Sequence, residues 1–198
     1  IHGESNIPEA HGKIKRLFTD PQVCKPLPDV IEAIRDAELI ILGPGSLYTS
    51  VTPNLLIKEI AHEIAISKAK KIYVCNIMTQ PGETDGYSVT DHINALIKHA
   101  GSKKIIDAVL VNDFMPSNLA KKYQLSGSYP VKLDLENLKK MGVRLVSRKL
   151  IEDSKEGLVR HSSNRVARAI YYWFRKEQKG QRVKNSIDQT QEKQGCAV

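Results

Sequence analysis

The chain has 198 residues, a formal net charge of +8 and a hydrophobic content of 41%, which fits a soluble globular protein of one domain. No apolar run is long enough to cross a membrane. We expect no signal peptide and a cytoplasmic protein without membrane-spanning segments. Basic residues are spread along the chain and aromatic residues make up only 6%, so nucleic acid is not an expected partner.

The first segment, residues 1–28, predicts short extended pieces and a stiff connection. Gly3, Pro8 and Gly12 break the early pieces, and prolines 21, 26 and 28 precede a short helix that begins near Asp29. Because the chain begins with isoleucine and not methionine, we expect a fragment whose missing N-terminal part holds some of the binding site.

The stretch 39–56 reads LIILGPGSLYTSVTPNLL and organises the rest of the chain. Residues 39–42 predict a strand buried on both faces, and the following glycines are expected to adopt positive φ. Thr52 as N-cap and Pro53 predict a helix over 54–68. Such a loop offers backbone N–H groups and hydroxyls to an anion, although an ordinary strand–helix connection fits equally well. The candidate ligand residues here are Gly43, Gly45, Ser46, Tyr48 and Thr49.

A second strand is predicted over 71–75 and is followed by a polar loop with turn signals at Pro81, Gly82 and Gly86. Glu83 and Asp85 offer carboxylates to Mg²⁺, or they stabilise the turn. Ser88 and Asp91 have the spacing of a capping box for a helix that ends at Gly101. The candidate ligand residues in this loop are Asn76, Thr79, Gln80, Glu83 and Thr84.

Strands 107–111 and 143–150 and short helices 117–123 and 135–141 are predicted next. Asn112 at the end of the third strand is a further candidate ligand residue. The last helix begins after Ser162 or Ser163, and the tail 179–198 lacks apolar periodicity and predicts disorder. We therefore expect one domain over 1–178 and a basic, polar tail.

The alternation of strands and helices predicts an α/β fold with a parallel sheet. Ligands of such sheets bind beyond the carboxyl ends of the strands. Three polar loops, over 43–50, 76–85 and 112–113, follow strand ends in this sequence and are expected to converge on one ligand site. Polar residues are common in all loops, and that simpler interpretation stays open.

Four motifs carry a family resemblance: GESNIP with GKIKR over 3–16, ILGPGSLYTSVTPNLL over 41–56, CNIMTQPGETDGY over 75–87 and VRH over 159–161. On these motifs the chain resembles the bacterial gluconeogenesis factor family, the sister branch of the CofD-like 2-phospho-L-lactate transferases, over residues 1–178. The family opens with a GGGTG-type loop on its first strand, and this sequence has no such loop.

The resemblance implies a Rossmann-like, three-layer fold with a mainly parallel sheet. It also implies a cytoplasmic protein that binds UDP-sugars such as UDP-N-acetylglucosamine and supports cell shape and wall synthesis on gluconeogenic carbon sources. By position, the family's nucleotide-sugar contacts fall on Tyr123 and Arg160. No catalytic residue and no certain cofactor are assigned, and a homo-oligomer is left open. The alternative is a transferase acting on a phosphorylated or nucleotide-linked substrate, with Asp85 or Asp113 available to a metal.

Overall fold

The structure is a computed structural model that describes residues 3, 6, 14–152 and 158–195, with side chains up to residue 180. The first motif of the resemblance, over 3–16, therefore lies largely outside the described residues.

Within the described residues, four strands form one sheet in the order β1-β2-β3-β4, and each neighbouring pair is parallel. Val109 on β3 pairs with Tyr73 on β2 and with Leu145 on β4, which places the carboxyl ends of the strands at one edge. The strand bounds are β1 (Leu39–Leu42), β2 (Lys70–Val74), β3 (Ala108–Asn112) and β4 (Arg144–Arg148). The predicted α/β fold with a parallel sheet is confirmed.

One face of the sheet packs against a layer of helices. Tyr73, Val109 and Val111 on the strands, Cys75 directly after β2 and Leu96 on α4 belong to one buried cluster. Full burial of a large apolar side chain stabilises a fold by about 1.5–3 kcal/mol. The helices of this layer are α1 (Pro28–Asp36), α2 (Thr52–Leu56), α3 (Lys58–Ile66), α4 (Val89–Ala100) and α6 (Leu135–Met141).

The other face of the sheet packs against α7 (Ser163–Gly195). Val74, Leu110 and Val146 meet Ile170 and Trp173 in a second buried cluster, which completes the three layers of a Rossmann-like fold.

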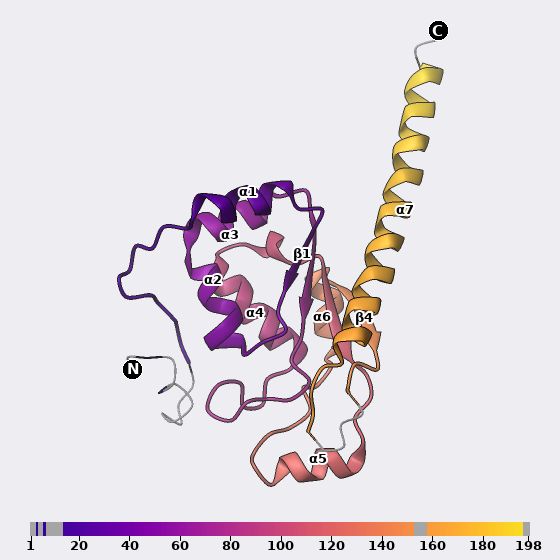
Figure 1. Ribbon diagram of the computed structural model, residues 1–198. Coiled ribbons are helices and arrows are strands. Elements are labelled where there is room, and N and C mark those ends of the chain that lie inside the picture. The colour runs from indigo at the N-terminus through magenta and orange to yellow at the C-terminus, as the bar shows by residue number, and fades with distance from the viewer. Residues whose placement is uncertain (1–2, 4–5, 7–13, 153–157, 196–198) are drawn as a thin grey trace.

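Helix α7 lies beside β4 and extends beyond the body of the molecule (Figure 1). Arg144 on β4 and Glu177 on α7 form an ion pair. The helix continues to Gly195, through the segment for which the sequence predicts a disordered tail. None of the helices in the described residues is both long and apolar enough to cross a membrane.

The strand and the helix expected in the stretch 39–56 differ from the structure. In the described residues, strand β1 is an edge strand and is not buried on both faces, because Ile41 is 45% exposed on the face of the sheet that packs against α7. The helix predicted over 54–68 is broken at Ile57, whose extended backbone (ψ 105°) separates α2 from α3.

The loop before that helix is itself partly helical, with a π-helical turn η3 over Leu47–Val51. The amides of Ser50 and Val51 both donate to the Ser46 carbonyl at 3.0 Å. Thr52 is the first residue of α2 and not its N-cap, and its hydroxyl donates to the Leu47 carbonyl at 2.6 Å.

The start and end of α4 follow the sequence prediction. Ser88 and Asp91 form the capping box, and Gly101 ends the helix in the left-handed conformation (φ 70°). A short 3₁₀ helix, η4 (Lys103–Ile105), leads into β3, and α5 (Ser117–Gln124) follows it. Helix α5 lies at the end of the molecule where the loops after the strands gather, and α1 lies at the opposite end (Figure 1).

Candidate functional site

A pocket of about 690 Å³ opens at the carboxyl edge of the sheet. Its walls come from segments that are far apart in the sequence: the loops after β1 and β2, the end of α5, and the segment before α7. We call it the edge pocket. Its lining residues are Pro44, Gly45, Ser46, Asn76, Ile77, Met78, Thr79, Gln80, Pro81, Glu83, Tyr123, Ser126, Ser128, Val159, Arg160 and His161.

The glycine loop after β1 needs left-handed backbone at Gly43, whose φ is +79°. A Cβ atom there would also lie 3.1 Å from the Val74 carbonyl oxygen of β2. The expectation of positive φ at Gly45 is wrong, since its φ lies outside the left-handed region; its Cβ would instead lie 3.2 Å from the Cβ of Ser50. Gly43 therefore fixes the turn, and Gly45 lines the pocket.

Side-chain amides connect the two strand-end loops. The Gln80 amide nitrogen donates to the Ser46 hydroxyl at 2.9 Å, and the Asn76 amide nitrogen donates to the Gln80 carbonyl oxygen at 3.3 Å. The Asn76 Oδ1 atom is buried and accepts no hydrogen bond from the described residues. The loops after β1 and β2 thus form one hydrogen-bonded wall of the edge pocket.

Thr79 holds the return segment after α5 against this wall. Its amide donates to the Tyr129 carbonyl at 2.7 Å, and its hydroxyl accepts from the Tyr129 amide at 3.0 Å. The Ser128 hydroxyl donates to the Thr79 carbonyl at 2.6 Å. Thr79 lines the pocket, but its polar groups are already used to build it.

Tyr123 and the segment that carries Arg160 are in direct contact. The Val159 amide donates to the Tyr123 hydroxyl at 2.9 Å, and the Glu152 amide donates to the Arg160 carbonyl at 2.9 Å. Arg160 is exposed, and no ion pair joins its guanidinium to another described residue. These contacts place a cation at the rim of the pocket just before the start of α7.

His161 next to Arg160 is a residue that sequence reasoning did not select, although it belongs to the VRH motif. Burial lowers the pKa of its imidazole, and the Cys75 carbonyl opposes this effect. Burial therefore favours the neutral form of this imidazole.

The edge pocket brings together eight of the candidate residues: Gly45, Ser46, Asn76, Thr79, Gln80, Glu83, Tyr123 and Arg160. Five others lie outside its lining: Gly43, Tyr48, Thr49, Thr84 and Asn112.

Three of those five have structural contacts. The buried Tyr48 hydroxyl lies 2.7 Å from the Tyr87 hydroxyl, and burial together with this bond raises the pKa of Tyr48. The Thr84 hydroxyl accepts a hydrogen bond from the backbone amide of Gln80 at 2.9 Å. The Asn112 side chain accepts from the Leu150 amide at 2.9 Å and so ties the end of β3 to the segment after β4. Thr49 is half-buried on the π-helical turn.

The carboxylates named as candidate metal ligands lie in different environments. Asp85 accepts from the Gly82 amide at 2.7 Å and stabilises its turn, and Asp113 accepts from the Ser147 hydroxyl at 2.8 Å. Neither lines the edge pocket, whereas the buried Glu83 does. Within residues 14–152 and 158–180, no three histidine, cysteine, aspartate or glutamate side chains lie close enough to hold a metal.

Ser126 and Ser128 line the pocket, although no sequence pattern marks them as candidate ligand residues. Their place depends on the return of the chain after α5, where Met78 forms a bridge with Pro130. That contact spans about fifty residues of sequence and follows from tertiary structure and not from any local pattern.

Residues 1–151 match the family described as "2-phospho-L-lactate transferase CofD". The chain is 46% identical over 168 residues to the gluconeogenesis factor of Bacillus subtilis (strain 168), covering 84% of this chain and 52% of that protein. It is also 46% identical over 175 residues to a putative gluconeogenesis factor of Nostoc sp., covering 88% of this chain and 38% of that protein. The chain thus spans about half, or less, of the length of these curated relatives.

A solved structure has the same fold. A protein of Bacillus halodurans, described as a member of the upf0052 family, superimposes with a TM-score of 0.80 at 44% sequence identity and covers 85% of this chain and 54% of that chain.

Proposed function

The chain belongs to the CofD family, and on that basis we propose that it binds a UDP-sugar, such as UDP-N-acetylglucosamine, in the edge pocket. The observation that carries this proposal is the convergence of the two strand-end loops with Tyr123 and Arg160 around one pocket of about 690 Å³. Pockets of this volume are the usual size for drug-sized ligands, and the carboxyl edge of a parallel sheet is the usual place for a nucleotide.

The proposed contacts follow from the chemistry of each group. The Arg160 guanidinium donates two parallel N–H···O hydrogen bonds to the diphosphate. It lies beside the positive end of the α7 dipole. Gly45 carries no side chain, so at this position only backbone atoms line the pocket after β1. The amide of Asn76 and the carboxylate of Glu83 suit the hydroxyl and N–H groups of the uridine and the sugar.

Tyr123 acts in this proposal mainly as a positioning residue. Its hydroxyl accepts the Val159 amide, so it holds the backbone next to Arg160 at the pocket rim. Loss of Tyr123 would therefore weaken binding through displacement of the guanidinium as well as through any direct contact of its ring with the ligand.

We propose further that binding is regulatory and not catalytic, and that the protein supports cell shape and wall synthesis during growth on gluconeogenic carbon sources in the cytoplasm. The curated relatives are gluconeogenesis factors. Transfer of a phosphorylated group usually needs carboxylates that hold a bridging metal, and Asp85 and Asp113 are turned to other partners away from the pocket. The name of the matched family keeps a transferase as the second candidate.

Titration calorimetry with UDP-N-acetylglucosamine, UDP, and N-acetylglucosamine tests the proposal. The expected order is strong binding of the nucleotide sugar, weaker binding of UDP and no detectable binding of the free sugar. Incubation of the chain with the nucleotide sugar and Mg²⁺, followed by chromatography of the nucleotides, is expected to show no turnover. Equal affinity for all three compounds would overturn the binding proposal. Release of UDP or UMP would show that the protein is a transferase, which is the second candidate function.

A further inference from the structure

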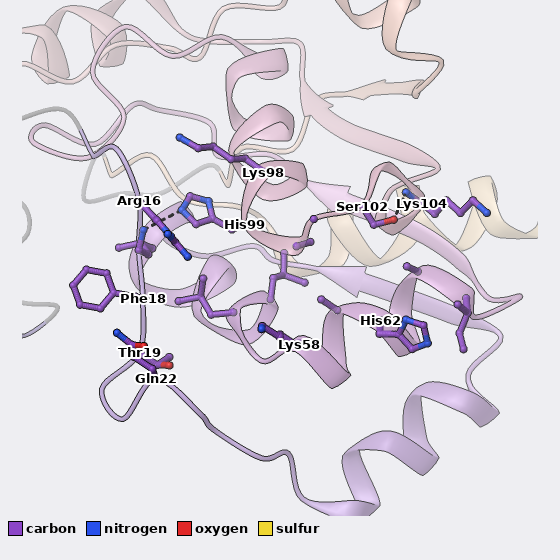
Figure 2. Close-up of a pocket in the computed structure, with 18 residues that line it drawn as sticks. Arg16, Phe18, Thr19, Gln22, Lys58, His62, Lys98, His99, Ser102 and Lys104 are labelled. Carbon is purple, nitrogen blue, oxygen red and sulfur yellow. Dashed lines mark hydrogen bonds between the residues drawn. The ribbon is translucent and has the colours of Figure 1, made fainter.

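A second and larger pocket, of about 1,020 Å³, lies beside the helical layer. Its outer wall is the segment 14–22, which we call the strap. Its inner wall comes from α2, α3 and the end of α4 (Figure 2). This strap pocket shares none of its described lining residues with the edge pocket, so it is a separate site.

The strap is fixed to α4 by two hydrogen bonds. The Leu17 amide donates to His99 Nε2 at 3.1 Å, and the Lys98 ammonium donates to the Lys15 carbonyl at 2.7 Å. The other ring nitrogen of His99 lies 2.7 Å from the Ala95 carbonyl, which requires the proton on Nδ1 and leaves Nε2 as the acceptor. The outer wall of the pocket is thus part of the fold.

The floor of the strap pocket is apolar, whereas its rim is cationic. The floor residues come from α2, α3 and α4: Leu55, Leu56, Ala61, Ala65, Ile66 and Ala100. The rim carries Arg16, Lys58, Lys98 and Lys104, and no aspartate or glutamate is among the described residues that line the pocket. Glu63 on α3 is instead engaged by Arg35 on α1 at 2.7 Å.

Arg16 extends from the strap and Lys58 from the start of α3, and both side chains reach toward the space between these segments (Figure 2). The described residues that line the pocket carry four cations and no carboxylate, and like charges that share a pocket repel one another. A bound anion relieves this repulsion, and an arginine fork binds phosphate or carboxylate through two parallel bonds. The apolar floor gains free energy when an apolar group covers it.

We propose that the strap pocket binds a small amphipathic anion, a molecule with an apolar body and a phosphate or carboxylate group. The apolar body covers the floor formed by Leu56 and Ala65, and the anionic group lies between Arg16 and Lys58. The volume is at the upper end of the range for small-molecule pockets, which suits a ligand with a chain or ring system better than inorganic phosphate.

Titration calorimetry on the full 198-residue chain with octyl phosphate, octyl glucoside and inorganic phosphate tests the proposal. The two octyl compounds are used below their critical micelle concentrations. Octyl phosphate is expected to bind about tenfold or more tightly than either of the others, because only it satisfies both the floor and the rim. Equal binding of octyl glucoside would indicate that only the octyl group is bound. Equal binding of phosphate would indicate that only the charged group is bound. Each result would overturn the proposal.

The double variant Arg16→Gln/Lys58→Gln is expected to bind octyl phosphate about tenfold or more weakly. Its control, Arg175→Gln/Lys176→Gln, removes the same charge from exposed positions of α7 and is expected to change the affinity by less than about twofold. UDP-N-acetylglucosamine binding should be the same in both variants, which separates this site from the edge pocket. An unchanged octyl phosphate affinity in Arg16→Gln/Lys58→Gln would contradict the assignment.

Discussion

The side-chain amide of Gln80 donates a hydrogen bond of 2.9 Å to the hydroxyl of Ser46. This contact joins the loop after β2 to the loop after β1 across the carboxyl edge of the sheet, and both residues line the edge pocket. The geometry of the proposed ligand site therefore depends on a bond between residues that are 34 positions apart in the sequence.

Gln80→Ala is expected to lower the affinity for UDP-N-acetylglucosamine by about two- to tenfold, because loss of a hydrogen bond of this kind costs about 0.5–1.5 kcal/mol. Titration calorimetry measures the change. The control is Gln124→Ala, at an exposed residue of α5 that does not line the pocket. Equal affinities for the two variants would show that the contact between the loops is irrelevant to binding.

Gly43→Ala is expected to destabilise the fold more than Gly142→Ala. Both glycines have positive φ, at +79° and +71°, so both variants carry strain of about 1–2 kcal/mol. An alanine Cβ at 43 also lies 3.1 Å from the Val74 carbonyl, whereas a Cβ at 142 meets no atom within 4 Å. The difference between the two variants in free energy of unfolding, measured by denaturant unfolding, gives the cost of the contact with the Val74 carbonyl. Equal losses of stability would mean that the end of the strand shifts to accommodate the added atom.

Cys75 is buried at the end of β2, and burial raises the pKa of its thiol to about 12. Since the thiolate is the reactive form, the variant Cys24→Ser/Cys196→Ser, which retains only Cys75, should not react with Ellman's reagent at pH 8 while folded. The same protein should react fully in guanidinium chloride. Rapid reaction of the folded variant would show that the strand end behind the edge pocket opens to solvent.

Stability is expected to fall as the pH drops from 7.5 to 5.5, in part because of His92. This ring is fully buried on α4, and burial lowers its pKa below the usual 6.5 while the Ser88 carbonyl opposes the shift. The unfolded chain therefore takes up a proton at a pH where the folded chain does not. The free energy of unfolding falls by up to about 1.4 kcal/mol for each unit by which the pH drops in this window.

The His92→Phe variant tests that assignment. It keeps an aromatic ring against Tyr87, where the ring centroids now lie 5.6 Å apart, and removes the titrating group. The free energy of unfolding of the variant should change less between pH 7.5 and 5.5 than that of the wild type. Identical slopes would assign the pH dependence to other groups, such as His161.

The parallel sheet and the α4 caps could be predicted from sequence because each has a local cause. Residues 39–42 and 107–111 are short apolar runs between turn signals, and Ser88 and Asp91 satisfy each other within one turn of helix. The break at Ile57 could not be predicted in this way, since the apolar spacing of Leu56, Ile60 and Ile64 continues through it.

The candidate site could be predicted in the loops after β1 and β2, where Ser46 and Asn76 line the pocket, but not after β3, because Asn112 lies outside the pocket lining. The sequence does not indicate that Tyr48 lies in the core and forms a hydrogen bond with Tyr87. It also gave no sign that Ser128 would reach Thr79, because both contacts depend on the packing of segments that are distant in the chain.

The most direct test of nucleotide-sugar binding is the affinity of Arg160→Ala for UDP-N-acetylglucosamine, measured by titration calorimetry beside Arg160→Lys and the exposed control Arg168→Ala. Loss of charge-assisted hydrogen bonds costs about 1.5–3 kcal/mol, so a loss of about tenfold to a hundredfold is expected for Arg160→Ala. Arg160→Lys should recover part of the loss, since lysine lacks the planar fork, and Arg168→Ala should bind as the wild type does. The melting temperature of Arg160→Ala should be unchanged, because the side chain is exposed. Wild-type affinity in Arg160→Ala would contradict the account, and so would unfolding of that variant, which would make Arg160 a structural residue.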